Sequence, residues 1–306
     1  MSPLALFGAI LPLYLCALAG FAAGRRLRVE SGPVANLLFY VVIPVVLFRG
    51  ALLTPLSAGA LALPVAAYVL CLGLCLLFYQ LSGLLWQDSR RDIIAAAAGL
   101  GNFGYFGLPV ALAVMGPEVE GRYVVALLGP MLYNFTAGYF FTAKGRHGGR
   151  DALLRTLRLP ALYAFLLGLS INLLGLKAPQ PLLQLTEHFR GAYIVLGMLM
   201  VGLSLAPLRS LRLDWSFIGM TFLARFLAWP LAVLLLLSAD RLWLGLFDAS
   251  ARGILALFSV VPLAASTAVL ASLFRLHEEQ VASAVLLSTL FAAAYVPLAL
   301  SLLGRL

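Results

Sequence analysis

The sequence predicts an all-α polytopic membrane protein with ten transmembrane helices, and three observations support this fold class. Of the 306 residues, 63% are apolar and 11% are charged, and the mean hydropathy is +1.02. A helix needs about 20 apolar residues to cross the hydrocarbon of a bilayer, and apolar runs of that order follow one another along the whole chain. A polar stretch divides these runs evenly. Little of the chain remains for a soluble domain.

The apolar runs give the order and the approximate bounds of the expected helices. They cover residues 4–23, 33–50, 60–80, 93–114, 122–142, 159–176, 188–205, 215–237, 252–272 and 281–302. No basic residue precedes the first run, and Arg25, Arg26 and Arg28 follow it. This order is the reverse of a secretory signal peptide, so we expect an uncleaved first helix.

The distribution of Lys and Arg predicts the orientation in the membrane. Thirteen of the 21 basic residues fall in the connections after odd-numbered helices, seven fall on the other side, and Arg225 lies inside the eighth helix. Cytoplasmic connections are enriched in Lys and Arg. We therefore expect a multi-pass protein of the cell inner (plasma) membrane with both termini outside. The net charge of +9 serves topology, so the lipid bilayer is the expected partner and nucleic acid is not.

An odd number of helices on each side of the central polar stretch predicts an inverted repeat. Five helices per half force the halves to insert in opposite orientations, which is common in secondary transporters. The expected parts are a first repeat at 1–143, a cytoplasmic linker at 144–158 and a second repeat at 159–306. Pro12 and Gly20 in the first helix have the same spacing as Pro160 and Gly168 in the sixth.

Glycine and proline are expected to break the fourth and ninth helices at corresponding places. The fourth contains Gly99, Gly101, Gly104, Gly107 and Pro109, and the ninth contains Pro262 near its middle. Glycine weakens a helix and proline removes a backbone donor, and in lipid the freed groups need partners from protein, water or ligand. Paired broken helices that cross indicate a transport site. The glycines alone also fit a small-residue helix-packing face.

Polar side chains near the predicted breaks are candidates for substrate binding. Asn102 is expected to contact substrate, to cap a freed helix end, or to do both. Asn134 fits either a ligand contact or a hydrogen bond between helices. Arg225 lies near the middle of the bilayer without a carboxylate at its depth. It either helps to hold an anion, or it snorkels or donates to carbonyls at a broken helix. The predicted site comprises Gly101, Asn102, Gly104, Asn134, Arg225, Pro262, Ser266 and Thr267, with Gly107 and Pro109 as helix-breaking residues.

These residues predict a positive midplane and hence an anionic substrate. Arg225, the helix N-termini, the amides and the hydroxyls of Ser266 and Thr267 all favour negative charge, and no Asp or Glu is expected at that depth. The function predicted from the residues is secondary transport of small organic anions. No cofactor or metal site is expected, and the coupling ion, H⁺ or Na⁺, stays open. An integral membrane enzyme is not expected, because no segment clusters the acids, histidines or nucleophile and base that catalysis needs.

The residues from Gly101 to Pro109 resemble the Asn-x-Gly-x-x-Gly-x-Pro signature of the auxin efflux carrier family, which includes bacterial malate and malonate permease-like proteins. The stretch from Arg158 to Gly168 resembles the start of that family's second half, and Val261 to Ser272 resembles its ninth helix. The similarity extends over essentially the whole chain.

The resemblance implies a ten-helix fold of two inverted five-helix repeats, related to that of bile acid sodium symporters. It implies scaffold helices at 4–50 and 159–205, which would form a homodimer contact, and transport helices at 60–142 and 213–302. The fourth and ninth helices would cross, and an elevator-type movement would carry a carboxylate such as malate, malonate or an auxin-like acid. The alternative function is a sodium-coupled symporter of larger amphipathic anions.

Overall fold

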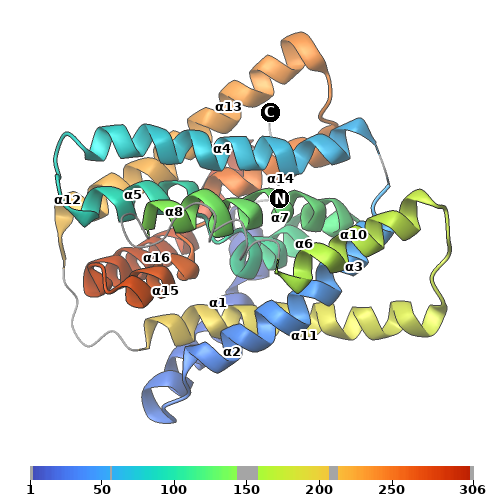
Figure 1. The fold of residues 1–306 in the computed structure, drawn as a ribbon, viewed down its shortest axis with the longest axis horizontal. Coiled ribbons are helices and arrows are strands. Elements are labelled where there is room, and N and C mark those ends of the chain that lie inside the picture. The colour runs from blue at the N-terminus through green and yellow to red at the C-terminus, as the bar shows by residue number, and fades with distance from the viewer. Residues whose placement is uncertain (1–2, 56, 143–157, 207–212, 304–306) are drawn as a thin grey trace.

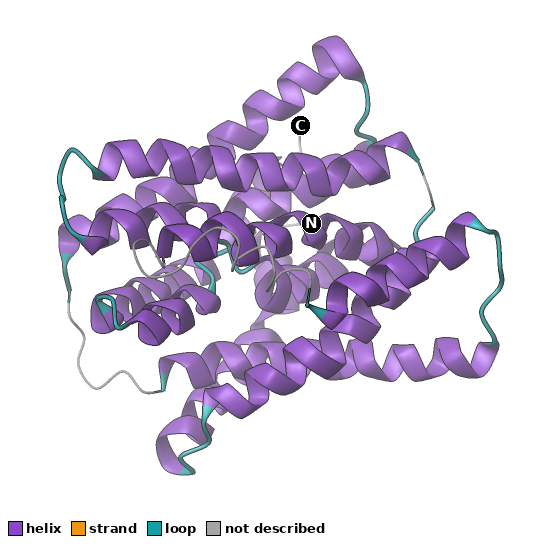
Figure 2. Ribbon diagram, in the orientation of Figure 1, coloured by secondary structure: helices purple, strands orange, loops and turns teal. Residues whose placement is uncertain are grey.

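The computed structural model describes residues 3–55, 57–142, 158–206 and 213–303, and nearly all of this part of the chain is helical (Figure 2). These residues contain no β-strand, and their one isolated β-bridge joins two helix breaks. The expected linker at 144–158 lies outside the described residues except for Arg158.

The described part of the first half of the chain forms eight α-helices, joined by short loops and by π or 3₁₀ turns. The α-helices are α1 (Pro3–Arg26), α2 (Ser31–Leu37), α3 (Ile43–Leu53), α4 (Ala58–Ser82), α5 (Ser89–Gly99), α6 (Leu108–Met115), α7 (Glu120–Tyr133) and α8 (Tyr139–Thr142). The turns are η1 (Leu38–Val42), η2 (Phe103–Gly107), η3 (Pro117–Val119) and η4 (Asn134–Gly138).

The described part of the second half follows the same plan. Its α-helices are α10 (Pro160–Leu173), α11 (Gln180–Leu205), α12 (Trp215–Leu223), α13 (Trp229–Ala239), α14 (Ala249–Val260), α15 (Ala265–Phe274) and α16 (Glu278–Leu303). The π turns η5 (Ala224–Ala228) and η6 (Asp240–Leu244) extend the helical segment that begins with α12.

Seven helical segments among the described residues are long and apolar enough to cross a membrane. Large apolar side chains on their outer faces are exposed, including Leu15, Val65 and Leu235. Such broad apolar exposure suits a lipid environment. The structure is thus that of a polytopic helical membrane protein.

Three of the ten expected helices are not continuous helices of spanning length. The fourth and ninth are broken, as their glycine and proline content predicts, so each gives two short helices. The sixth, expected at 159–176, ends at Leu173. Gly175 takes a positive φ of 66° there, and the Leu176 N–H bonds back to the Ile171 carbonyl, which closes the helix end.

Side-chain caps fix where four helices begin. The caps are Ser57 before α4, Asp88 before α5, Asp214 before α12 and Asp248 before α14. Each side chain accepts a hydrogen bond from a backbone N–H in the first turn of its helix. Because these N–H groups have no partner inside the helix, a side-chain acceptor stabilises the helix start. The broken segments therefore begin at defined residues.

Glycines allow two pairs of helices to pack at backbone distance. A side chain at Gly20 of α1 would collide with the Leu199 backbone of α11, and one at Gly168 of α10 would collide with the Phe48 backbone of α3. Close approach of this kind is a common way for membrane helices to associate. Figure 1 shows α11 along one side of the molecule and α4 towards the other. The broken segments contact both, because η2 packs against α11 and α5 against α4.

Candidate functional site

The two helix breaks lie against each other as a short antiparallel pair. The Asn102 N–H donates to the Pro262 carbonyl at 2.8 Å, and the Ala264 N–H donates to the Leu100 carbonyl at 3.3 Å. Gly101 and Leu263 face each other between these two bonds. Backbone groups that leave a helix in a membrane protein need partners, and here each break supplies them to the other.

The carbonyl ends of the first half-helices are occupied by side chains from other helices. The Tyr133 hydroxyl donates to the Ala96 carbonyl at 3.1 Å, and Trp229 Nε1 donates to the Ala98 carbonyl at 2.7 Å, both at the end of α5. Arg225 Nε donates to the Val261 carbonyl at 2.5 Å, and Nη2 donates to the Phe258 carbonyl, at the end of α14. The negative ends of both helix dipoles are therefore already paired.

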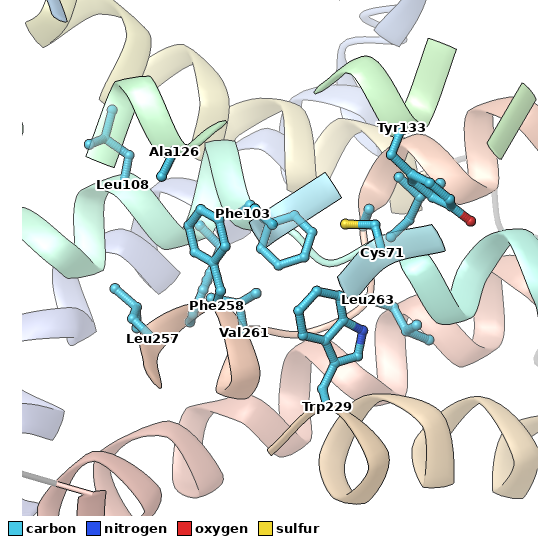
Figure 3. Close-up of a cluster of buried hydrophobic side chains, with 14 of the residues drawn as sticks. Cys71, Phe103, Leu108, Ala126, Tyr133, Trp229, Leu257, Phe258, Val261 and Leu263 are labelled. Carbon is cyan, nitrogen blue, oxygen red and sulfur yellow. The ribbon is translucent and has the colours of Figure 1, made fainter. Parts of the chain in front are cut away.

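Arg225 is completely buried and packs among aromatic rings at the centre of the site. Its Cζ lies 4.5 Å from the Trp229 ring centroid and 5.1 Å from that of Phe103. Figure 3 shows Phe103 between Phe258 and Trp229, with ring centroids 4.7 and 5.3 Å away. Of the two interpretations offered by the sequence, these contacts match donation to carbonyls at a broken helix. Nη1 of Arg225 has no hydrogen-bond partner.

The second half-helices begin at a cavity of about 130 Å³. One starts at Phe103 and runs to Met115, and the other is α15, which starts at Ala265. The first N–H groups of a helix lack intrahelical partners and carry partial positive charge. A cavity needs a volume of about 10–15 Å³ to hold one water. This cavity therefore has room for a small ligand beside the positive helix ends.

Asn102 lines this cavity, and its two polar side-chain atoms have different surroundings. Its Oδ1 accepts a hydrogen bond from the Phe106 N–H at 3.2 Å, which caps the second half of the fourth helix. Its Nδ2 is buried and has no hydrogen-bond partner, and the side chain is 4% exposed. Capping uses the oxygen and leaves the amide donor of this cavity-lining residue without a partner.

Of the predicted site residues, Gly101, Asn102, Gly104, Asn134 and Ser266 line the cavity. The Oδ1 atom of Asn134 is buried without a partner. Among the described residues that line the cavity, none is charged. Its other walls are mostly apolar and include Phe39, Ile43, Leu47, Leu127, Met131 and Phe135.

The other predicted site residues lie behind the cavity wall. Pro262 contributes its carbonyl to the paired breaks, and Thr267 is buried with its hydroxyl unpaired. Gly107 packs against the Tyr123 hydroxyl, and Pro109 lies in the first turn of α6. The prediction that Gly107 and Pro109 break the fourth helix was wrong in position: both lie inside the helical stretch Phe103–Met115, and the chain leaves the helix earlier, between Gly99 and Phe103. Neither residue lines the cavity.

Several aromatic residues of the site, among them Tyr133 and Trp229, were missed by sequence reasoning. Tyr105 and Tyr193 both line the cavity with ring centroids 5.9 Å apart, and the Tyr105 hydroxyl is buried without a partner. The position of Tyr105 inside the glycine-rich motif was an available signal. Nothing local marks Tyr193 or Trp229, because aromatic residues are frequent in membrane helices.

A polytopic helical protein with a cavity at two paired helix breaks belongs to the class of membrane transporters. Residues 5–300 match the family described as membrane transport protein, which is the auxin efflux carrier family, and the chain belongs to it. It is also similar to an uncharacterized transporter of Methanocaldococcus jannaschii, with 26% identity over 274 residues that make up 86% of each chain. The family and this relative are transporters and not enzymes.

Proposed function

We propose that the chain crosses the membrane ten times as two inverted five-helix repeats. The two bonds between the breaks support this, because they correspond to each other. Asn102 and Ala264 are the donors, one in each half, and Pro262 and Leu100 are the acceptors in the opposite halves. The caps follow the same relation. Ser57 and Asp88 in the first half have counterparts in Asp214 and Asp248 in the second.

The packing glycines also fit an inverted repeat. Gly20 brings the first helix of one half against the second helix of the other, α11, and Gly168 does the same for α10 and α3. These four helical segments form the proposed scaffold, at 4–50 and 159–205, and the proposed homodimer contact. The remaining helices, at 60–142 and 213–302, form the transport body, which moves past the scaffold as an elevator. The proposed setting is the inner (plasma) membrane with both termini outside.

We infer that the substrate is a small organic anion bound by its carboxylate at the paired breaks. The observation that carries this proposal is an asymmetry in the hydrogen bonding. The carbonyl ends of the half-helices are filled by Tyr133, Trp229 and Arg225, whereas Asn102 Nδ2 has no partner and no side chain caps α15, which begins at the cavity. A carboxylate supplies acceptors to such donors and is favoured by the positive helix ends.

The walls of the cavity favour a monocarboxylate with an apolar body over a dicarboxylate. No Lys, Arg or His lines the cavity in the described part of the chain, and most side chains away from the breaks are apolar. A second carboxylate there would lose its hydration without gaining a partner, which is costly. Malate and malonate are therefore expected to be poorer substrates than acids with one carboxylate.

Counterflow of labelled acids in proteoliposomes tests this function. The panel contains malate, malonate, lactate, phenylacetate and indole-3-acetate, each with and without Na⁺ and H⁺ gradients. We expect saturable exchange of a monocarboxylate, and its ion dependence identifies the coupling ion. Exchange only of dicarboxylates contradicts the assignment of the cavity walls. No exchange of any acid by folded protein contradicts the anion site itself.

A further inference from the structure

Two side chains from one turn of the helical segment Trp215–Leu244, which contains α12, η5 and α13, contact both helix breaks. Arg225 and Trp229 are four residues apart, so their side chains lie on the same face of the helix. Arg225 donates to the end of α14, and Trp229 donates to the end of α5. We propose that these residues form a clamp that fixes the two half-helices relative to each other and so positions the donors of the anion site. This inference rests on the proposed anion site.

The clamp is built around the ring of Phe103, the first residue after Asn102. The Trp229 ring, the Phe258 ring and the Arg225 guanidinium all lie within contact distance of it. Phe103 therefore cannot shift without displacing groups that hold both breaks. Since Phe103 is bonded to Asn102, the clamp also fixes the direction of the Asn102 amide.

Arg225 also acts electrostatically through Gly101. A Cβ at Gly101 would lie 2.8 Å from Arg225 Cζ and 2.9 Å from Nη1, so the guanidinium packs directly against the Gly101 backbone. Gly101 also lines the cavity. Only backbone therefore separates the positive charge from the proposed carboxylate. A buried charge acts over such distances because little water screens it.

No carboxylate pairs with Arg225 among the described residues, and its charge is balanced by the carbonyl ends of α14. This explains why an arginine lies beside a cavity that it does not line. Arginine donates through several N–H groups in a fixed plane and stacks on aromatic rings, and lysine cannot do both at once. Arg225 and Trp229 are positioning residues, and substrate contact belongs to the cavity.

The clamp lies entirely within the proposed transport body, which predicts how its loss affects transport. Both side chains and both half-helix ends belong to α5, η5, α13 and α14. Such a clamp shapes the binding site but does not resist the sliding of this body past the scaffold. Loss of the clamp is therefore expected to raise KM while the maximum rate stays nearly constant.

Hydrogen exchange tests the clamp without depending on transport. The variant Trp229→Phe keeps an aromatic six-membered ring and removes the pyrrole part of the indole, with the N–H donated to Ala98, and Arg225→Met keeps the side-chain stem and removes the charge. Mass spectrometry follows peptides covering 95–106 and 256–267. We expect faster exchange in the first peptide for Trp229→Phe and in the second for Arg225→Met. Leu227→Ala, on the same turn but 51% exposed, is the control and should match the wild type.

Counterflow of the best carboxylate of the panel then tests the positioning role. We expect KM to rise about tenfold in Arg225→Met and severalfold in Trp229→Phe, with less than about a twofold change in maximum rate. An unchanged KM in both variants overturns the proposal. So does hydrogen exchange in both variants equal to that of Leu227→Ala. If Arg225→Met does not fold, Trp229→Phe alone decides. Absence of all counterflow in the wild type contradicts the anion transport function. The hydrogen-exchange measurement still tests the clamp in that case.

Discussion

Asn102→Asp separates the helix-capping role of this asparagine from its proposed role in binding the substrate. The two side chains have nearly the same shape, and the new carboxylate still has an oxygen for the Phe106 N–H that caps the helix. The change replaces the unpartnered Nδ2 donor by a negative oxygen on a residue that lines the cavity. The helix start should survive, whereas binding of an anion should not.

The expected loss follows from the charge. Two like charges about 4 Å apart interact by about 4 kcal/mol at an effective dielectric constant of about 20, which corresponds to a loss of about a thousandfold in affinity. Asn102→Ala removes the donor and the cap without adding charge. A hydrogen bond to a charged group contributes about 1.5–3 kcal/mol, so this variant should lose about ten- to a hundredfold.

The assay is counterflow over a range of pH, with thermal unfolding in detergent as a check on the fold. At neutral pH the order of affinity should be wild type, Asn102→Ala, then Asn102→Asp. At low pH the new carboxyl group gains a proton, loses its charge and becomes a donor, so transport by Asn102→Asp should recover. Equal transport by Asn102→Asp and the wild type at neutral pH would refute an anion at this amide. A lower affinity for Asn102→Ala than for Asn102→Asp at neutral pH would also refute it.

Three further predictions follow from the packing and the charges. Gly101→Ala should lower stability by about 1–3 kcal/mol and reduce transport because its Cβ collides with the clamp, whereas Gly73→Ala, which meets nothing within 4 Å, should do neither in the same thermal unfolding and counterflow assays. Glu120, 6% exposed and bound by two arginines of neighbouring helices, should lower the unfolding temperature when changed to Gln, and an unchanged temperature would contradict that role. The pKa of Asp248 lies below 3.8, first because it caps the Ala251 N–H and also because an arginine donates to it. Its contribution to stability is full above pH 3.8 and is lost as the pH falls through the lowered pKa, so Asp248→Asn should flatten the acid end of a stability profile measured by unfolding.

Local chemistry was sufficient to predict the broken helices. Glycine and proline act on their own backbone, so the interruptions in the fourth and ninth segments follow from residues within a single turn. The interruption after Gly99 and the one around Pro262 lie where the sequence indicates. The length of the sixth helix was overestimated, because hydropathy continues past Gly175 whereas its positive φ ends the helix.

The role of each site residue depended on contacts that sequence spacing does not contain. Arg225 fitted either an anion contact or a carbonyl donor when only its depth was known. Its bonds to Phe258 and Val261 favour the second interpretation. Tyr193 reaches the cavity from a helix about 90 residues away from the motif. Such long-range proximity requires the packing of α11 against η2.

The sequence by itself determined the membrane class, the order of the apolar segments, the two breaks and the excess of positive charge. These properties follow from composition and from short-range backbone chemistry, which each segment carries alone. The tertiary structure decided which helix ends are filled and which are free. Hydrogen bonds at the breaks join groups up to 164 residues apart, so only the folded arrangement leaves Asn102 Nδ2 without a partner on a residue that lines the cavity. The physical reason is that a polar group in a membrane must be paired, and only the fold specifies its partner.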